Sequence, residues 1–174
     1  MRGLEMADLK ITSDEPEFLL DIFLQPGDFY WGDAETRIRT LLGSCISITM
    51  WHPILKEGGM CHFMLPSRPS IQQGGPHTRY ADAVMELFLS HVARSKRKPS
   101  EYVVKVFGGG SMLREQADNV EIVGQRNIRA AEELLAKNGF KVIASDVGGN
   151  VYRRIQFNIW SGDVWVKRKE SSAG

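Results

Sequence analysis

Hydrophobic and polar positions alternate along much of the chain, a pattern typical of strands whose two faces meet different surroundings. The clearest case covers residues 45–51, where one face carries Ile46, Ile48 and Met50 and the other face carries polar residues and Trp51. Similar segments predict further strands at 17–25, 37–42, 59–65, 102–107, 140–146, 152–159 and 163–168.

Two segments instead place apolar residues at helical spacing. They cover residues 79–94 and about 127–138, and Gly139 follows the second where a helix favours glycine. A Ser161-Gly162 turn joins the last two strands as a hairpin. The predicted fold class is therefore α/β (an α+β sandwich), with a mainly antiparallel, hairpin-rich sheet and two main helices in a single domain.

The length of 174 residues suits one domain and is short for two. Residues 1–16 are polar and patternless and predict a loosely ordered N-terminal tail, which leaves 17–174 as the folded domain. A loop at 67–78 either gates a substrate or merely connects its neighbours.

The formal net charge of +1 gives no electrostatic footprint for a nucleic acid or an anionic membrane. The N-terminus lacks the apolar region of a secretory signal, and no stretch is apolar for long enough to cross a membrane. Two cysteines do not make a disulfide framework, which suits a reducing compartment. We expect a cytoplasmic protein without a nucleic-acid partner and without direct membrane insertion.

One thiol and one imidazole are candidates for chemistry. If the segments around 45–51 and 58–65 form a hairpin symmetric about Pro53-Ile54, Cys45 lies directly opposite His62, within reach of a hydrogen bond. A slip of one residue would move His62 to the other face. The same register places Cys61 on the opposite face from Cys45, which predicts a small buried hydrophobe and no disulfide.

A thiolate is the reactive form of cysteine, and a neighbouring imidazolium would lower the pKa of the thiol. Cys45 also follows a bend at Gly43-Ser44, where exposed backbone N–H groups could stabilise an oxyanion. A buried cysteine beside a core histidine would give the same sequence pattern, so the pair alone leaves both interpretations open.

The other candidate residues favour structural roles. We expect His52 to be solvated in a turn, His77 to lie on the surface of the long loop, and His91 to sit at the edge of the core. No pair of His or Cys has a zinc spacing. The glycine runs 108–110 and 148–149 fit no phosphate-binding fingerprint and predict tight turns or close backbone approach.

Several motifs resemble those of one family. They are Leu42-Gly43-Ser44-Cys45, Gly59-Met60-Cys61-His62-Phe63-Met64-Leu65-Pro66, and the segments 79–83, 105–109, 124–127 and 146–150. In content and order they resemble the CheD family of chemoreceptor glutamine deamidases, over roughly residues 36–168.

This resemblance implies a hydrolase in which Cys45 is the nucleophile and His62 its base. The implied substrates are glutamines on the cytoplasmic domain of methyl-accepting chemoreceptors, and neither a metal nor an organic cofactor is needed. A CheC-type phosphatase is a further implied partner.

The sequence departs from the family pattern near the nucleophile. The family's third catalytic residue is a threonine six positions before the cysteine, where this chain has Arg39, and Thr40 follows one place later. Either a bulge restores Thr40 as the group that orients His62, or that role is missing or differently filled. Cys61 and Ala81 also stand where the family often has asparagine and glycine.

Two other functions compete with the deamidase. A CheD-like binding module could engage receptors or the phosphatase with weak or no activity, and the departure at Arg39 is its main support. A redox or thiol-protease-like protein is the second, although a redox role requires Cys45 and Cys61 to approach each other.

Overall fold

The structure is a computed structural model, and it describes residues 14–70, 77–111 and 122–171. Most of the predicted N-terminal tail and half of the predicted 67–78 loop lie outside these residues. Among the described residues, no helix combines the length and the apolar character needed to span a membrane.

Within the described residues, nine strands form two sheets, which we call sheet A and sheet B. Sheet A has the order β1 (Leu20–Leu24), β3 (Thr36–Leu42), β8 (Val151–Asn158), β9 (Asp163–Glu170). Sheet B has the order β2 (Phe29–Gly32), β5 (Glu57–Cys61), β4 (Ile46–His52), β6 (Val103–Gly108), β7 (Val142–Val147). The helices are α1 (Ala81–Ser95), α2 (Val123–Lys137) and the short 3₁₀ helix η1 (Pro99–Glu101).

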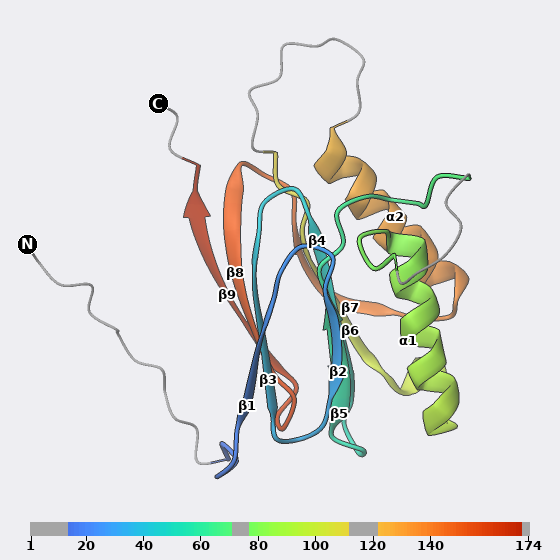
Figure 1. Ribbon diagram of the computed structural model, residues 1–174, viewed down its shortest axis with the longest axis vertical. Coiled ribbons are helices and arrows are strands. Elements are labelled where there is room, and N and C mark those ends of the chain that lie inside the picture. Colours follow the sequence, from blue (N-terminus) through green and yellow to red (C-terminus); the bar gives the residue numbers. More distant parts are fainter. Residues whose placement is uncertain (1–13, 71–76, 112–121, 172–174) are drawn as a thin grey trace, which may run out of the picture.

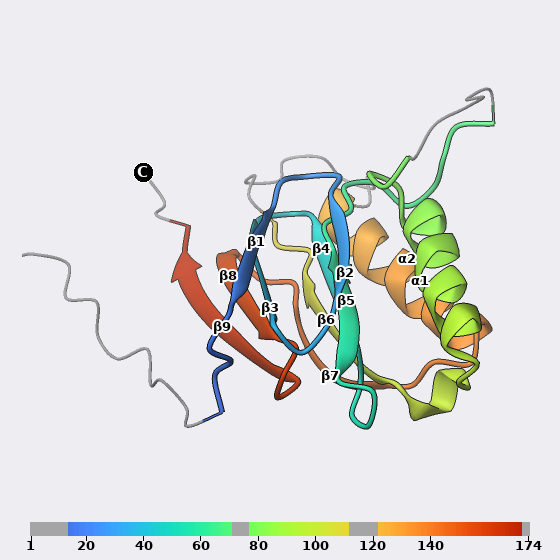
Figure 2. The same cartoon turned by 60° about the horizontal axis from the view of Figure 1, so that its bottom comes forward.

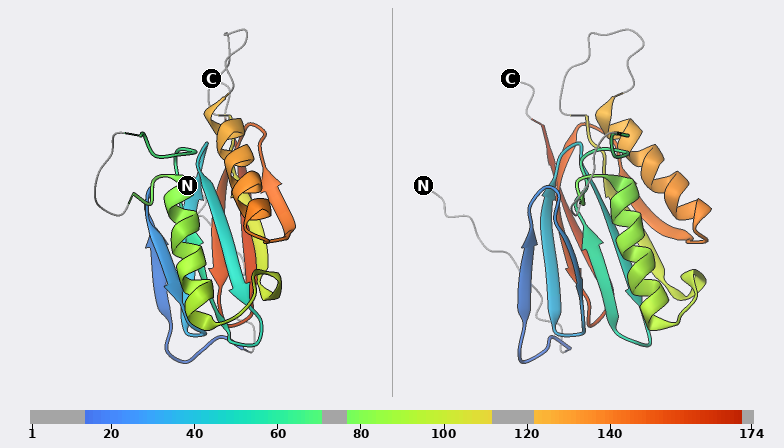
Figure 3. Two further views of the ribbon diagram at one scale, coloured as in Figure 1. Left: turned by 90° about the vertical axis from the view of Figure 1, so that its right-hand side faces the viewer. Right: turned by 45° about the vertical axis from the view of Figure 1, so that its right-hand side comes forward.

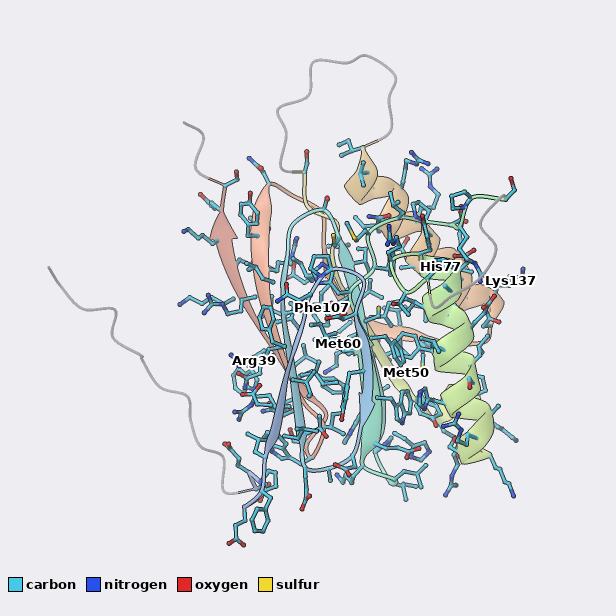
Figure 4. All side chains as sticks on the ribbon, in the orientation of Figure 1. Arg39, Met50, Met60, His77, Phe107 and Lys137 are labelled. Carbon is cyan, nitrogen blue, oxygen red and sulfur yellow. The ribbon has the colours of Figure 1, made fainter. Side chains whose placement is uncertain are left out.

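The elements stack in three layers, with sheet B between sheet A and the two long helices (Figure 1). Both helices cover the outer face of sheet B, and none covers the outer face of sheet A (Figures 2 and 3). Alternation along the strands of sheet B produces two apolar cores. Met50 packs toward the helices, whereas Met60 and Phe107 pack between the sheets (Figure 4).

The predicted α+β fold with two main helices in one domain is confirmed, with two differences in the sheets. There are two sheets rather than one, and both are mixed because β1 pairs with β3, and β6 with β7, in parallel. Strand β2 was not predicted. Its four residues are all half-buried, so no alternation of apolar and polar positions marks it.

The register of the β4–β5 hairpin differs from the prediction by two residues. Thr49 pairs with Met60, and Ile46 pairs with Phe63, so Cys45 and His62 are not directly opposite each other. The cause is the turn: the strand continues to His52, and the Lys56 N–H closes a four-residue loop on the His52 carbonyl at 2.9 Å. Lys56 adopts a positive φ of 52°, which completes the reversal one residue later than a loop centred on Pro53-Ile54 would.

Candidate functional site

The candidate site lies where the chain crosses from one sheet to the other. Strand β3 belongs to sheet A and β4 to sheet B, and residues 43–45 connect them at the upper end of the sandwich in Figure 1. Cys45 is half-buried at this crossover and packs against the core between the sheets. Its thiol is free and not part of a disulfide.

His62 follows the last residue of β5 and is 2% exposed. The turn between β1 and β2 holds its backbone on both sides. Gly27 donates its N–H to the His62 carbonyl at 2.7 Å, and His62 donates its N–H to the Asp28 carbonyl at 3.0 Å. The imidazole is therefore attached to a backbone that two hydrogen bonds immobilise.

Thr40 connects sheet A to this imidazole. Its hydroxyl oxygen lies 2.7 Å from Nδ1 of His62 and 2.8 Å from the carbonyl oxygen of Leu24. Strand β3 keeps an unbroken register against both neighbours, so Thr40 faces inward without a bulge. Arg39 faces outward (Figure 4), where its Nε donates to Asp21 at 2.8 Å.

The two contacts of Thr40 determine the tautomer of His62. The Leu24 carbonyl can only accept, so the single hydroxyl hydrogen of Thr40 is donated to it. The Thr40 oxygen must then accept a hydrogen bond from Nδ1–H of His62. In a neutral imidazole this leaves Nε2 with a free lone pair, which is the form that accepts a proton.

Cys45 and His62 lie diagonally across the two arms of the β4–β5 hairpin. The pair Ile46 and Phe63 separates them, so both side chains share the face opposite to the helices. Diagonal neighbours on one face have Cβ atoms roughly 7–8 Å apart, which a long or aromatic side chain can span. The two-residue shift of register preserves the face of each residue, and thus the predicted separation of Cys45 from Cys61.

The charge states of the pair differ from the sequence-based expectation. Burial lowers the pKa of His62 to about 4, although the charge of Asp28 and a backbone hydrogen bond at Leu24 oppose this effect. Burial also raises the pKa of the Cys45 thiol. An imidazolium that lowers the thiol pKa was therefore the wrong expectation, because near neutral pH the pair consists of a thiol and a neutral imidazole.

The glycine segment 108–110 holds the backbone of the crossover. Gly109 donates its N–H to the Cys45 carbonyl at 2.8 Å, and Gly110 donates to the Gly43 carbonyl at 2.9 Å. A Cβ atom at Gly108, whose φ is 110°, would collide with the carbonyl oxygen of Cys45. The predicted close backbone approach of 108–110 is thus confirmed, and its partner is the peptide of Cys45.

Asn127 on α2 is a site residue that sequence reasoning did not single out. Its side-chain Nδ2 donates to the carbonyls of Ser44 at 3.1 Å and Met64 at 2.8 Å, and its buried Oδ1 has no hydrogen-bond partner in the part of the chain that the structure describes. Asn127 therefore ties the segment before Cys45 to the segment after His62. The signal available in the sequence was an asparagine placed among the apolar positions of an amphipathic helix, next to Ile128 and one turn before Ala131.

The remaining candidates take structural positions. Cys61 is fully buried, as predicted, and burial raises its pKa to about 12. His91 stacks on Trp31 at 4.6 Å between ring centroids, at the edge of the core as expected.

The expectation for His52 was wrong, because β4 continues through it and its ring is 1% exposed against Tyr102. His77 is half-buried, and its Nε2 has no partner among the described residues. Within those residues, no three His, Cys, Asp or Glu side chains cluster so that they could hold a metal ion.

Comparison with known proteins points to one family. Residues 64–168 match the family described as CheD chemotactic sensory transduction. A probable chemoreceptor glutamine deamidase CheD 3 of Dechloromonas aromatica is 44% identical over 88% of this chain and 91% of its own length. A probable chemoreceptor glutamine deamidase CheD 1 of Leptospira interrogans is 42% identical over 90% of this chain and 97% of its own length.

A probable chemoreceptor glutamine deamidase CheD of Pseudomonas syringae is also 42% identical, over 91% of this chain and 90% of its own length. Among solved structures, a Bacillus licheniformis hypothetical protein, YfiH, is 10% identical with a TM-score of 0.44. That match covers 76% of this chain and 61% of the other, and nothing about function follows from it.

Proposed function

Because this chain belongs to the CheD family, we propose that it is a protein-glutamine deamidase that acts on methyl-accepting chemoreceptors in the cytoplasm. In this proposal Cys45 is the nucleophile, His62 is the general base and acid, and Thr40 orients His62. The observation that carries the assignment is the contact of Thr40 with both the Leu24 carbonyl and Nδ1 of His62. It supports a neutral imidazole whose Nε2 is ready to accept a proton.

The first half of the reaction forms a thioester. Nε2 of His62 takes the proton of the Cys45 thiol as sulfur attacks the side-chain carbonyl carbon of glutamine. The tetrahedral intermediate then collapses, the carbon–nitrogen bond breaks, and the imidazolium returns the proton to the leaving nitrogen, which departs as ammonia. The raised pKa of the thiol makes this concerted proton transfer necessary, because little free thiolate exists at neutral pH.

The second half releases glutamate. His62 accepts a proton from water as the water oxygen attacks the thioester carbon, and the carbon–sulfur bond breaks as the proton passes to the thiolate. The carboxylic acid gives its proton to ammonia in solution, so the sum is glutamine plus water to glutamate plus ammonium, and the enzyme returns to its starting state.

In this proposal the crossover backbone supplies the oxyanion site. No described residue accepts a hydrogen bond from the backbone N–H of Ser44 or Cys45, whereas the neighbouring carbonyls of Gly43 and Cys45 are both bonded. Free N–H groups beside a nucleophile can stabilise the negative oxygen of a tetrahedral intermediate.

A pure binding role loses its main support in this geometry. Arg39 was a concern because it stands where the family has threonine, but Arg39 points outward to Asp21 and Thr40 contacts the imidazole. A CheC-type phosphatase remains a proposed second partner on the strength of the family resemblance.

The experiment is ammonia release by the purified protein with a chemoreceptor cytoplasmic fragment from the same organism. The proposal expects release that depends on the fragment and is abolished by Cys45→Ala and His62→Gln, whereas Cys61→Ala retains it. Binding of the fragment without ammonia release would instead support the binding module, and peptide-bond cleavage would support a protease.

A further inference from the structure

Arg153 buries a guanidinium group between the two sheets. It lies on β8, its side chain is 3% exposed, and its cross-strand neighbours are Leu42 and Arg168. A charged group is rarely buried unless it is paired and hydrogen-bonded. The partners of Arg153 therefore indicate what this position requires.

The hydrogen-bond partners of Arg153 lie on sheet B or in the loop that follows β7. Nε and Nη2 of Arg153 donate to Oδ1 of Asp146 at 3.2 and 3.1 Å. Nη2 also donates to the Gly148 carbonyl at 2.7 Å, and Nη1 donates to the Gly108 carbonyl at 3.4 Å. One side chain of sheet A thus binds three groups at the end of β6 and β7.

One of the two bound carbonyls, that of Gly108, belongs to the glycine segment that holds the backbone of Cys45. Gly148 donates its own N–H to the Gly108 carbonyl at 2.9 Å, so Arg153 closes a small network around that oxygen. The next residue, Gly109, donates to the Cys45 carbonyl. A Cβ atom at Gly108 would collide with that carbonyl, so the glycine segment and the Cys45 peptide are in close contact.

We propose that Arg153 is a positioning residue for Cys45: from the opposite sheet it clamps the Gly108–Gly109 turn that holds the nucleophile's backbone. The inference rests on the proposed role of Cys45 as nucleophile. Arginine suits the task because its planar fork binds several acceptors in one fixed geometry, which lysine cannot reproduce. A buried ion pair often adds little to the net stability of a fold, so the pair of Arg153 and Asp146 is weak evidence that Arg153 serves stability alone.

Arg168 provides a matched control on the neighbouring strand. Its Nε donates to Oδ2 of the same Asp146 at 2.8 Å, but its side chain is 64% exposed and binds no glycine carbonyl. Removing Arg168 takes a cation from Asp146 and leaves the contacts of Arg153 with the glycine turn in place.

The test compares Arg153→Lys, Arg153→Met and Arg168→Met in the full chain. Two rates are measured per folded molecule: kcat and KM on a receptor fragment, and alkylation of Cys45 by iodoacetamide, located by peptide mass. Both Arg153 variants should lower kcat by about tenfold or more with little change in KM, since small displacements of a reacting group are costly. They should also speed Cys45 alkylation, because a released turn no longer keeps the thiol half-buried.

Arg168→Met should match the wild type in both rates. The inference is overturned if a folded Arg153→Lys variant has the kcat and the Cys45 alkylation rate of the wild type. It is also overturned if the loss of total activity is fully explained by a smaller amount of folded protein. The two hypotheses fail separately: if the wild type has no deamidase activity, the proposed function fails, whereas a selective effect of Arg153 on Cys45 alkylation would still support the clamp.

Discussion

The hydroxyl of Thr40 lies 2.7 Å from Nδ1 of His62 and joins the two sheets at the candidate site. Thr40 belongs to sheet A, whereas His62 follows a strand of sheet B. The relative position of the sheets therefore sets the orientation of the imidazole, and the tautomer follows from the second contact of Thr40 with Leu24.

Removing the Thr40 hydroxyl should impair the reaction more than the fold. Thr40→Val keeps the shape of the side chain but lets the imidazole adopt the wrong tautomer, and we expect kcat to fall by about 10²-fold, the scale of general-base effects. Thr40→Ser is the control and should retain most activity. Steady-state kinetics with a receptor fragment measures both, and equal rates for Thr40→Val and the wild type would contradict the orienting role.

The depressed pKa of His62 should appear in the pH dependence of catalysis. As the proposed base, His62 must be neutral, and with a pKa of about 4 it stays neutral through the mildly acidic range. We expect kcat/KM to hold its value as pH falls from 7 to about 5 and to decline only near pH 4, since kcat/KM reports groups of the free enzyme. A decline centred near pH 6.5 would show an unperturbed histidine and contradict this account.

The same pKa makes stability depend on pH. An unfolded histidine takes up a proton near pH 6.5, but folded His62 does so only near pH 4, so the unfolded state binds more protons between these values. His62 should therefore cost the folded state up to about 3 kcal/mol as pH falls through this window, with no cost above pH 6.5. Urea unfolding at several pH values measures this, and His62→Gln should show a smaller decrease.

The glycine turn at 108–110 allows a prediction with an internal control. Gly108→Ala, at a φ of 110°, would place a methyl group against the Cys45 carbonyl, whereas Gly149→Ala, at a φ of 71°, would meet nothing within 4 Å. Both substitutions should lower the stability of the fold by on the order of 1–3 kcal/mol, because alanine disfavours a positive φ. Only Gly108→Ala should also displace Cys45 and abolish activity. If the two variants lose activity equally, backbone strain alone explains the effect.

The sequence predicted most elements but not the way they meet. Period-2 and helical patterns are local, so β3, β4, β8 and both helices were found within a few residues of their observed ends. Strand β2 was missed because a four-residue, half-buried edge strand carries no alternation. The pairing of strands into two sheets depends on contacts that no local pattern contains.

The site shows the same limit. Hairpin symmetry brought Cys45 and His62 to one face, but the position of the turn, which fixes the register, was misjudged by one residue. Asn127 and Arg153 were not predicted as site residues because they bind the backbone carbonyls of Met64 and Gly108, which are far away in sequence. Backbone acceptors leave no signature in the side-chain sequence.

The most direct test is tandem mass spectrometry of a chemoreceptor fragment incubated with the purified protein in water enriched in oxygen-18. If water hydrolyses a thioester on Cys45, particular glutamines should gain about three mass units, because the nitrogen of the amide is replaced by heavy oxygen. The gain should be absent with Cys45→Ala. Unchanged glutamines with the wild-type protein, or an equal gain with Cys45→Ala, would contradict the account.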